Sequence, residues 1–145
     1  MKQGFVKVAS ATPRIRVADP VYNAQVICEQ AKEAAEHGAK IVVFPELCIT
    51  GYTCNDLFLQ ELLLEKAKEA LLTIAEETGQ LETLFLVGLP VDKDGRLYNV
   101  AAVLYRGRIL GMIPKKNIPM YAEFYEGRHF TPGEETVTEY RLGKQ

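Results

Sequence analysis

The sequence predicts an α/β domain in which a mixed β-sheet carries helices on one face. Three observations indicate this class. An amphipathic helical pattern lies between two short apolar runs, an order that is typical of strand, helix and strand. Two tight turns, at Asp92 to Gly95 and at Arg106–Gly107, separate three later apolar runs, and turns this short join strands that pair antiparallel. With 145 residues, 48% of them hydrophobic, the chain is long enough to bury one core.

The first unit runs from Phe5 to Phe44. Phe5 to Ala11 predicts a short strand, and Asp19–Pro20 predicts a helix start, with a capping carboxylate followed by a proline that the first turn tolerates. The helix should end near Gly38. Its apolar residues recur at helical spacing: Ala24, Ile27, Cys28, Ala31 and Ala35. Ile41 to Phe44 then reads as a strand that is buried on both sides.

The rest of the chain predicts one more helix and several strands. The helix follows a capping signal at Asn55–Asp56, and Gly79 ends it. The predicted elements are a helix over Leu57–Thr78 and strands over Leu84–Leu89, Leu97–Tyr105, Arg108–Ile113 and Thr136–Leu142. The region from Pro114 to Gly133 follows neither period, and long ordered loops of this kind are often functional.

Charge and composition argue against several classes of partner. Seventeen basic and nineteen acidic residues give a net charge of −2, without a basic cluster that would bind nucleic acid or a membrane surface. Three cysteines without a CxxC pair and two distant histidines lack zinc-site spacing. The sequence has neither a secretory signal nor a glycine-rich phosphate loop. We therefore expect a cytoplasmic chain with free thiols, no metal and no cofactor.

Glu46 is the first candidate for chemistry. It follows Pro45 at the carboxyl end of a buried strand, where layered α/β sheets tend to bind ligands. Its apolar neighbours Leu47, Cys48 and Ile49 would partly desolvate the carboxylate and raise its pKa toward the range of a general base. The alternative is that Pro45–Glu46 only turns the chain into solvent.

Lys115 and Lys116 are the second candidate, because they follow Pro114 at the end of another strand. Paired lysines usually extend into water. An ammonium group that points inward beside Glu46 would instead stabilise an oxyanion on a carbonyl that becomes tetrahedral. This requires that the two strand ends lie next to each other, which we predict.

Two segments resemble a known family. "VVFPELCITGYTCNDLF", residues 42–58, and "GRILGMIPKKNIPMYAEFYEGRHFTPG", residues 107–133, resemble the nitrilase-like carbon–nitrogen hydrolases. Within them, the chain is most similar to the glutamine amidohydrolase (glutaminase) domain of glutamine-dependent NAD synthetases. The opening residues are similar as well, so the resemblance covers the whole chain. It implies an α-β-β-α sandwich, of which residues 1–145 would form the N-terminal part.

The resemblance also implies roles for individual residues. The family uses a Glu, Lys and Cys triad, whose first two members match Glu46 and Lys115. Tyr52 and Tyr121 would help form the glutamine pocket or order the base, and Glu123 would be a second carboxylate near the triad. Buried aromatics and a carboxylate at the rim are the alternatives for these three positions.

In the family, the nucleophilic Cys follows the Lys at a distance that would place it after Gln145. Cys48 and Cys54 do not match its position. We therefore expect a partial domain over residues 1–145 that lacks its C-terminal portion and has no turnover by itself. The parent protein would release ammonia from glutamine for an ATP-dependent synthetase domain in NAD synthesis, and would be a homo-oligomer. A free-standing small-amide amidase of the same superfamily and a non-catalytic interaction module stay open as alternatives.

Overall fold

A mixed five-stranded sheet forms the centre of the computed structural model, which describes residues 4–145. The strands lie in sequence order: β1 (Val8–Ser10), β2 (Ile41–Val43), β3 (Leu84–Lys93), β4 (Arg96–Tyr105) and β5 (Arg108–Pro114). β1, β2 and β3 are parallel neighbours, whereas β3, β4 and β5 are antiparallel. The predicted mixed sheet is therefore confirmed.

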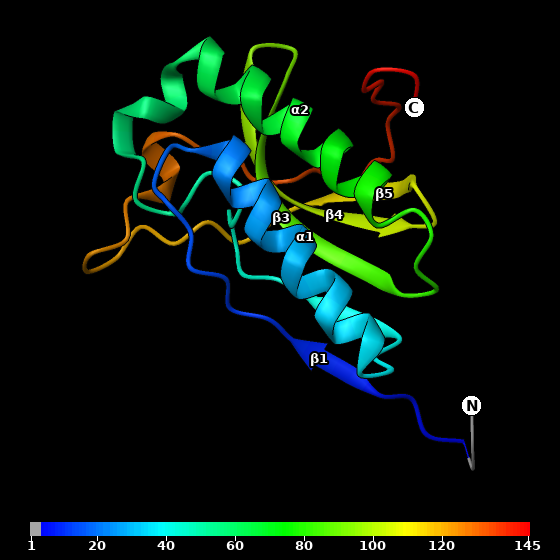
Figure 1. Cartoon of the computed structure of the whole chain (residues 1–145). Helices are drawn as coiled ribbons and strands as arrows, with labels where there is room; N and C mark the ends of the chain where they lie inside the picture. The colour runs from blue at the N-terminus through cyan, green and yellow to red at the C-terminus, as the bar shows by residue number, and fades with distance from the viewer. Residues whose placement is uncertain (1–3) are drawn as a thin grey trace.

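Two helices, α1 (Pro20–Glu36) and α2 (Glu61–Glu77), lie side by side over one face of this sheet (Figure 1). The Asp19 carboxylate caps α1 by accepting a hydrogen bond from the backbone N–H of Tyr22 at 3.1 Å, as the sequence predicts. The main core lies between the helices and the sheet. Its fully buried members include Ile27, Leu71, Ile74, Val42 and Val87. Within residues 4–145, neither helix is long and apolar enough to cross a membrane.

The opposite face of the sheet is apolar, and it is exposed except where the turn at Pro45–Leu47 lies against Gly88. Val8, Val43 and Ile113 point away from the helices, and 63%, 44% and 57% of their surfaces are exposed. Among the described residues, no helix covers this side (Figure 1). Residues 4–145 thus form one helix layer and one sheet. The apolar sequence of β2 predicts a strand that is buried on both faces, whereas only one of its faces is covered in this structure.

The predicted long helix over Leu57–Thr78 is wrong in its first turn. A short 3₁₀ helix, η1 (Asn55–Leu59), comes first, and extended backbone at Gln60 separates it from α2. Phe58 in η1 is 2% exposed and packs edge-on against the ring of Phe130 at 5.0 Å. The helical spacing of apolar residues continues across Gln60, so the sequence pattern gives no sign of the interruption there. The interruption depends on the packing of Phe58 against Phe130.

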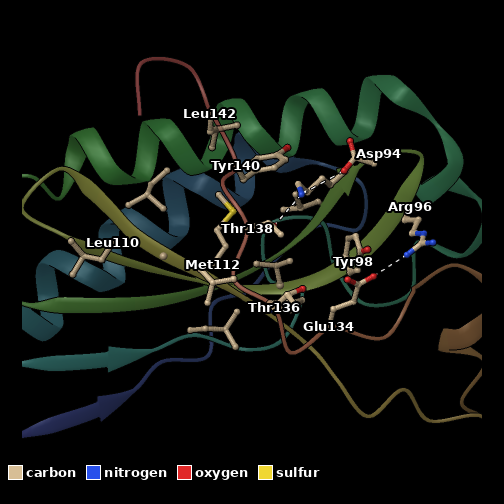
Figure 2. Close-up of a pocket in the computed structure, with 18 of the residues that line it drawn as sticks. Asp94, Arg96, Tyr98, Leu110, Met112, Glu134, Thr136, Thr138, Tyr140 and Leu142 are labelled. Carbon is tan, nitrogen blue, oxygen red and sulfur yellow. Dashed lines mark hydrogen bonds and ion pairs between the residues drawn. The ribbon is translucent and has the colours of Figure 1, made fainter.

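The predicted strand over Thr136–Leu142 is also wrong, because this segment pairs with no strand. Its side chains hold it instead: Lys93 Nζ donates to Thr138 Oγ1 at 3.0 Å, and the Tyr140 hydroxyl donates to the Asp92 carbonyl at 3.3 Å. A cavity of about 870 Å³ remains between this segment and β4 and β5 (Figure 2). An alternating pattern of apolar and polar side chains predicts which face of a segment is buried. It does not show whether another strand is available to pair with the segment, which is why the strand prediction failed here.

Candidate active site

Glu46 lies in a tight turn that is built into the core. Leu47, Cys48 and Ile49, the three residues that follow it, are at most 2% exposed. Leu47 adopts a positive φ of 51°, and its carbonyl accepts a hydrogen bond from the Gly51 N–H at 2.7 Å. The Glu46 side chain nevertheless remains 41% exposed. The sequence therefore anchors the backbone of this turn in apolar packing and leaves the carboxylate partly accessible.

Gly88 of β3 allows this turn to lie directly on the sheet. A Cβ atom at residue 88 would contact the backbone N of Leu47 and would lie 2.8 Å from the Pro45 carbonyl oxygen. The Gly88 carbonyl also accepts a hydrogen bond from the Ile49 N–H at 3.1 Å. Only a glycine permits such a close approach of two backbones.

Lys115 reaches Glu46 from the end of β5. Its Nζ donates to Glu46 Oε1 at 2.7 Å, and its backbone N–H donates to the Asn99 carbonyl at 2.7 Å. Lys116 points away, and its exposed side chain pairs with the exposed Glu135. The predicted adjacency of the two strand ends is confirmed, and Lys115 is the lysine that turns inward.

Glu126 is the second carboxylate that contacts Lys115, a position for which the sequence had suggested Glu123. It lies in η2 (Glu126–Arg128), is 6% exposed, and accepts from Lys115 Nζ at 2.9 Å on each of its two oxygens. Burial lowers the pKa of Lys115, but the hydrogen bonds to Glu46 and Glu126 outweigh it and raise that pKa overall. Lys115 is therefore a permanent cation between two carboxylates.

Tyr52 joins this network through Glu126. Its hydroxyl donates to Glu126 Oε1 at 2.8 Å. Burial, followed by the hydrogen bond to Glu126 and the charge of that carboxylate, raises the pKa of Tyr52 to about 12. Tyr52 thus holds the second carboxylate in place and does not contact Glu46 through its hydroxyl.

Asn99 of β4 completes a polar cluster with Glu46, Lys115, Glu126 and Tyr52, and the sequence did not predict its part in the site. Its Nδ2 donates to Glu46 Oε1 at 2.6 Å, and the residue is 4% exposed. A lone carboxamide in the otherwise apolar stretch "NVAAVL" is the signal that could have singled it out, because a buried amide needs a partner. No comparable signal separates Glu126 from Glu123 in "YAEFYEG".

Asp56 anchors η2 to the segment before α2. Its carboxylate pairs with Arg128 at 3.2 Å and with His129 Nε2 at 3.1 Å. The hydrogen bond with His129 and the charge of Arg128 lower the pKa of Asp56. Figure 1 shows the orange η2 region beside the start of α2. Asp56 was predicted as a helix-capping residue, and it instead lies within η1 and connects that short helix to η2.

Tyr121 and Glu123 lie on the exposed part of the loop. Tyr121 is 69% exposed and stacks edge-on against Phe124 at 5.6 Å. Glu123 is exposed, and among residues 4–145 it makes no ion pair, so Glu126 rather than Glu123 occupies the position against Lys115. The binding roles of Tyr121 and Glu123 stay predictions.

The cysteines do not supply a thiolate to this site. Cys28, Cys48 and Cys54 are all free and buried. Burial raises the pKa of Cys28 and of Cys48 to about 11, and it raises that of Cys54 as well. Thiols of this kind are protonated and inert near neutral pH. In the described part of the chain, no group of three His, Cys, Asp or Glu side chains could hold a metal ion.

The arrangement places the Glu46 carboxylate beside the Lys115 ammonium group, which Glu126 holds in position. Glu46 can take up or return a proton, and Lys115 can donate a hydrogen bond to a developing negative oxygen nearby. The cavity in Figure 2 is a separate feature, since its lining includes Pro114 but neither Glu46 nor Lys115. Chemistry is therefore expected at the strand ends and not in this cavity.

Comparisons with known proteins agree on one family. A family model described as carbon-nitrogen hydrolase matches residues 7–144. The glutamine-dependent NAD(+) synthetase of Mycobacterium tuberculosis is 39% identical over 142 residues, which are 98% of this chain and 21% of that protein. The chain thus spans about a fifth of the length of the curated relatives that it matches.

Solved structures give the same result. A glutamine-dependent NAD(+) synthetase from Cytophaga hutchinsonii superposes with a TM-score of 0.87 at 29% identity, covering 96% of this chain and 24% of that one. An amidase from Nesterenkonia superposes with a TM-score of 0.73 at 25% identity, covering 93% of this chain and 51% of that one. A variant of that amidase carries an acetamide moiety added covalently at its active-site cysteine.

Proposed function

Because this chain belongs to the carbon–nitrogen hydrolase family, we propose that it is the N-terminal part of a glutaminase domain that hydrolyses the side-chain amide of glutamine. The products are glutamate and ammonia. The observation that carries the proposal is the contact of Lys115 Nζ with Glu46 Oε1 at 2.7 Å, which pairs a candidate base with a candidate oxyanion donor. The similarity to glutamine-dependent NAD(+) synthetases supports glutamine as the substrate.

The proposed reaction uses a cysteine from outside residues 1–145, since the three thiols within them are buried and protonated. Glu46 takes the proton of that thiol as the sulfur attacks the amide carbon. Lys115 donates to the resulting oxyanion, and Glu46 returns the proton to the departing nitrogen, which leaves as ammonia. Water then attacks the thioester and gives a proton to Glu46, and Glu46 passes this proton to the departing sulfur, so that glutamate and the free thiol are released. Tyr52, Tyr121 and Glu123 are proposed to line the glutamine pocket.

In this proposal the ammonia passes to an ATP-dependent synthetase domain that lies outside this chain and amidates the NAD precursor. The protein is proposed to work in the cytoplasm as a homo-oligomer. The three free, buried cysteines suit a reducing compartment. The exposed apolar face of the sheet, with Val8, Val43 and Ile113, suits a chain whose second sheet comes from the remainder of the domain.

The first experiment compares ammonia release from glutamine by the 145-residue chain and by the full-length protein that contains it. We expect turnover only in the full-length protein, and we expect Glu46→Gln to reduce its kcat by at least about 10³-fold, because the general base also activates the nucleophile. Exchange of the exposed Glu135 for Gln is the matched control. Full activity of Glu46→Gln would contradict the proposal and favour a non-catalytic interaction module.

A second candidate, a small-amide amidase, is favoured by the superposition on the Nesterenkonia enzyme. The two candidates differ in substrate, so the same assay with propionamide or acetamide separates them. Ammonia release from simple aliphatic amides that exceeds release from glutamine would select the amidase. Release from glutamine alone would select the glutaminase.

A further inference from the structure

We propose that Asn99 is a positioning residue that ties Glu46 and Lys115 together and leaves Oε2 of Glu46 as the oxygen that exchanges protons. The inference rests on the proposed amide hydrolysis at this site. It adds a residue to that reaction and specifies which oxygen of the carboxylate acts as the base.

Asn99 contacts both charged residues, each with a different group. Its side-chain Nδ2 donates to Glu46 Oε1 at 2.6 Å, whereas its backbone carbonyl accepts from the Lys115 N–H at 2.7 Å. The residue is 4% exposed and lies within β4, with Pro90 of β3 as its register partner. Its position is therefore set by the sheet, and the two charged residues are aligned on a rigid element rather than on a loop.

The two hydrogen bonds to Glu46 converge on one oxygen. Lys115 Nζ and Asn99 Nδ2 both donate to Oε1, at 2.7 Å and 2.6 Å. Among residues 4–145, no side chain or backbone group donates to Oε2. An oxygen that already accepts two hydrogen bonds, one of them from a cation, is a poor acceptor for a further proton, so proton exchange falls to Oε2.

The second donor also fixes the rotation of the carboxylate. A glutamate held by one ammonium group can swing about its terminal torsion, because that torsion is broad. Asn99 on β4 donates a second hydrogen bond that approaches the carboxylate from another direction than Lys115 does. The two donors together select one orientation of the Glu46 carboxylate. A base that is fixed before the substrate binds loses less entropy in the transition state.

The first test is by NMR on the unmodified 145-residue chain and needs no catalysis. The side-chain amide resonances of Asn99 are expected to shift with pH at the midpoint at which the δ-carboxyl carbon of Glu46 titrates. Glu46→Gln should abolish this shift. If the side-chain amide resonances of Asn99 do not shift when Glu46 ionises, the inference is overturned, whatever reaction the site performs.

The second test is kinetic and uses Asn99→Leu in the full-length protein. We expect kcat to fall about 10- to 100-fold, the range for a hydrogen bond to a charged group, while KM changes less than about threefold. The acidic limb of the kcat profile should move to higher pH, because the ionised form of Glu46 loses a donor.

Thr83→Val is the matched control, because Thr83 is 3% exposed and donates to the Ala39 carbonyl at 2.8 Å, away from the cluster. It should lower stability but leave kcat and the acidic limb unchanged. An Asn99→Leu variant that behaves like this control would overturn the inference. Unchanged activity in Glu46→Gln would instead overturn the proposed function, so the two failures can be told apart.

Discussion

Two loops bring charges to the same cluster, and they are built differently. The turn after β2, which carries Glu46, has three consecutive side chains that are at most 2% exposed. The loop after β5, which carries Lys115 and Glu126, is largely on the surface: Met120, Tyr121 and Tyr125 are 59%, 69% and 66% exposed.

The two loops are therefore held by different forces. Apolar packing and backbone hydrogen bonds hold the turn of Glu46. The loop of Lys115 has one buried apolar anchor, Phe130, and depends otherwise on polar side-chain contacts at Glu126 and Asp56. Substitutions beneath the first loop should change stability and the site together. Substitutions of the polar residues in the second should change the site with a smaller loss of stability, since a hydrogen bond contributes less than the packing of a core side chain.

The largest effect is expected from Gly88→Ala. The new methyl group would overlap the backbone at Leu47 and Pro45, neither of which can move as a flexible side chain would. We expect a loss of about 2–4 kcal/mol in the free energy of unfolding, measured by urea denaturation, together with displacement of Glu46. Gly111→Ala in β5 is the control, because nothing lies within 4 Å of its added Cβ. Equal stability of the two variants would contradict the close approach described here.

A smaller effect is expected from Glu126→Gln. This buried carboxylate accepts two hydrogen bonds from Lys115 and one from Tyr52, and an amide replaces them only in part. The free energy of unfolding should fall by about 1–2 kcal/mol. The control is Glu135→Gln at the exposed Lys116 pair, which should change it by less than about 0.5 kcal/mol. A loss as small as that of the control would show that Glu126 does not hold the loop.

Asp56→Asn should alter how stability depends on pH. The pKa of Asp56 is lowered in the folded state, so its contribution is complete above the unfolded pKa of about 3.9 and is lost as the pH falls through the folded value. The variant should have a lower Tm than the parent at pH 6, and the difference should narrow toward pH 2. Thermal unfolding followed by circular dichroism measures both. A constant difference across this range would exclude the carboxylate charge as the cause.

The smallest effect is expected from Tyr52→Phe, which removes one hydroxyl from a partly exposed residue. The pKa of Tyr52 is raised to about 12, so its contribution to stability is complete below about pH 10 and is lost as the pH rises toward 12. In an ultraviolet titration of the folded chain, the variant should lack one tyrosine ionisation that the parent shows near pH 12. In Glu126→Gln, that tyrosine should ionise at a lower pH, since the hydrogen bond and the charge that hold its proton are removed.

Much of the fold could be predicted from local pattern. Helical spacing located α1, and the apolar runs and turn residues located β2 to β5. The misses share one cause. The break at Gln60 and the unpaired segment Thr136–Leu142 depend on contacts with distant residues, and neither a helical nor an alternating period records such contacts.

The candidate site shows the same division. The sequence by itself determined that Glu46 and Lys115 each follow a strand, because both positions depend only on neighbouring residues. The family resemblance had already matched Lys115 rather than Lys116, and the structure places its Nζ on Glu46. Tertiary structure alone decided that Asn99 and Glu126 join them. These contacts join residues up to 69 positions apart, so they depend on strand register and on the packing of η2. A shift of one residue in that register would turn each side chain to the other face of the sheet.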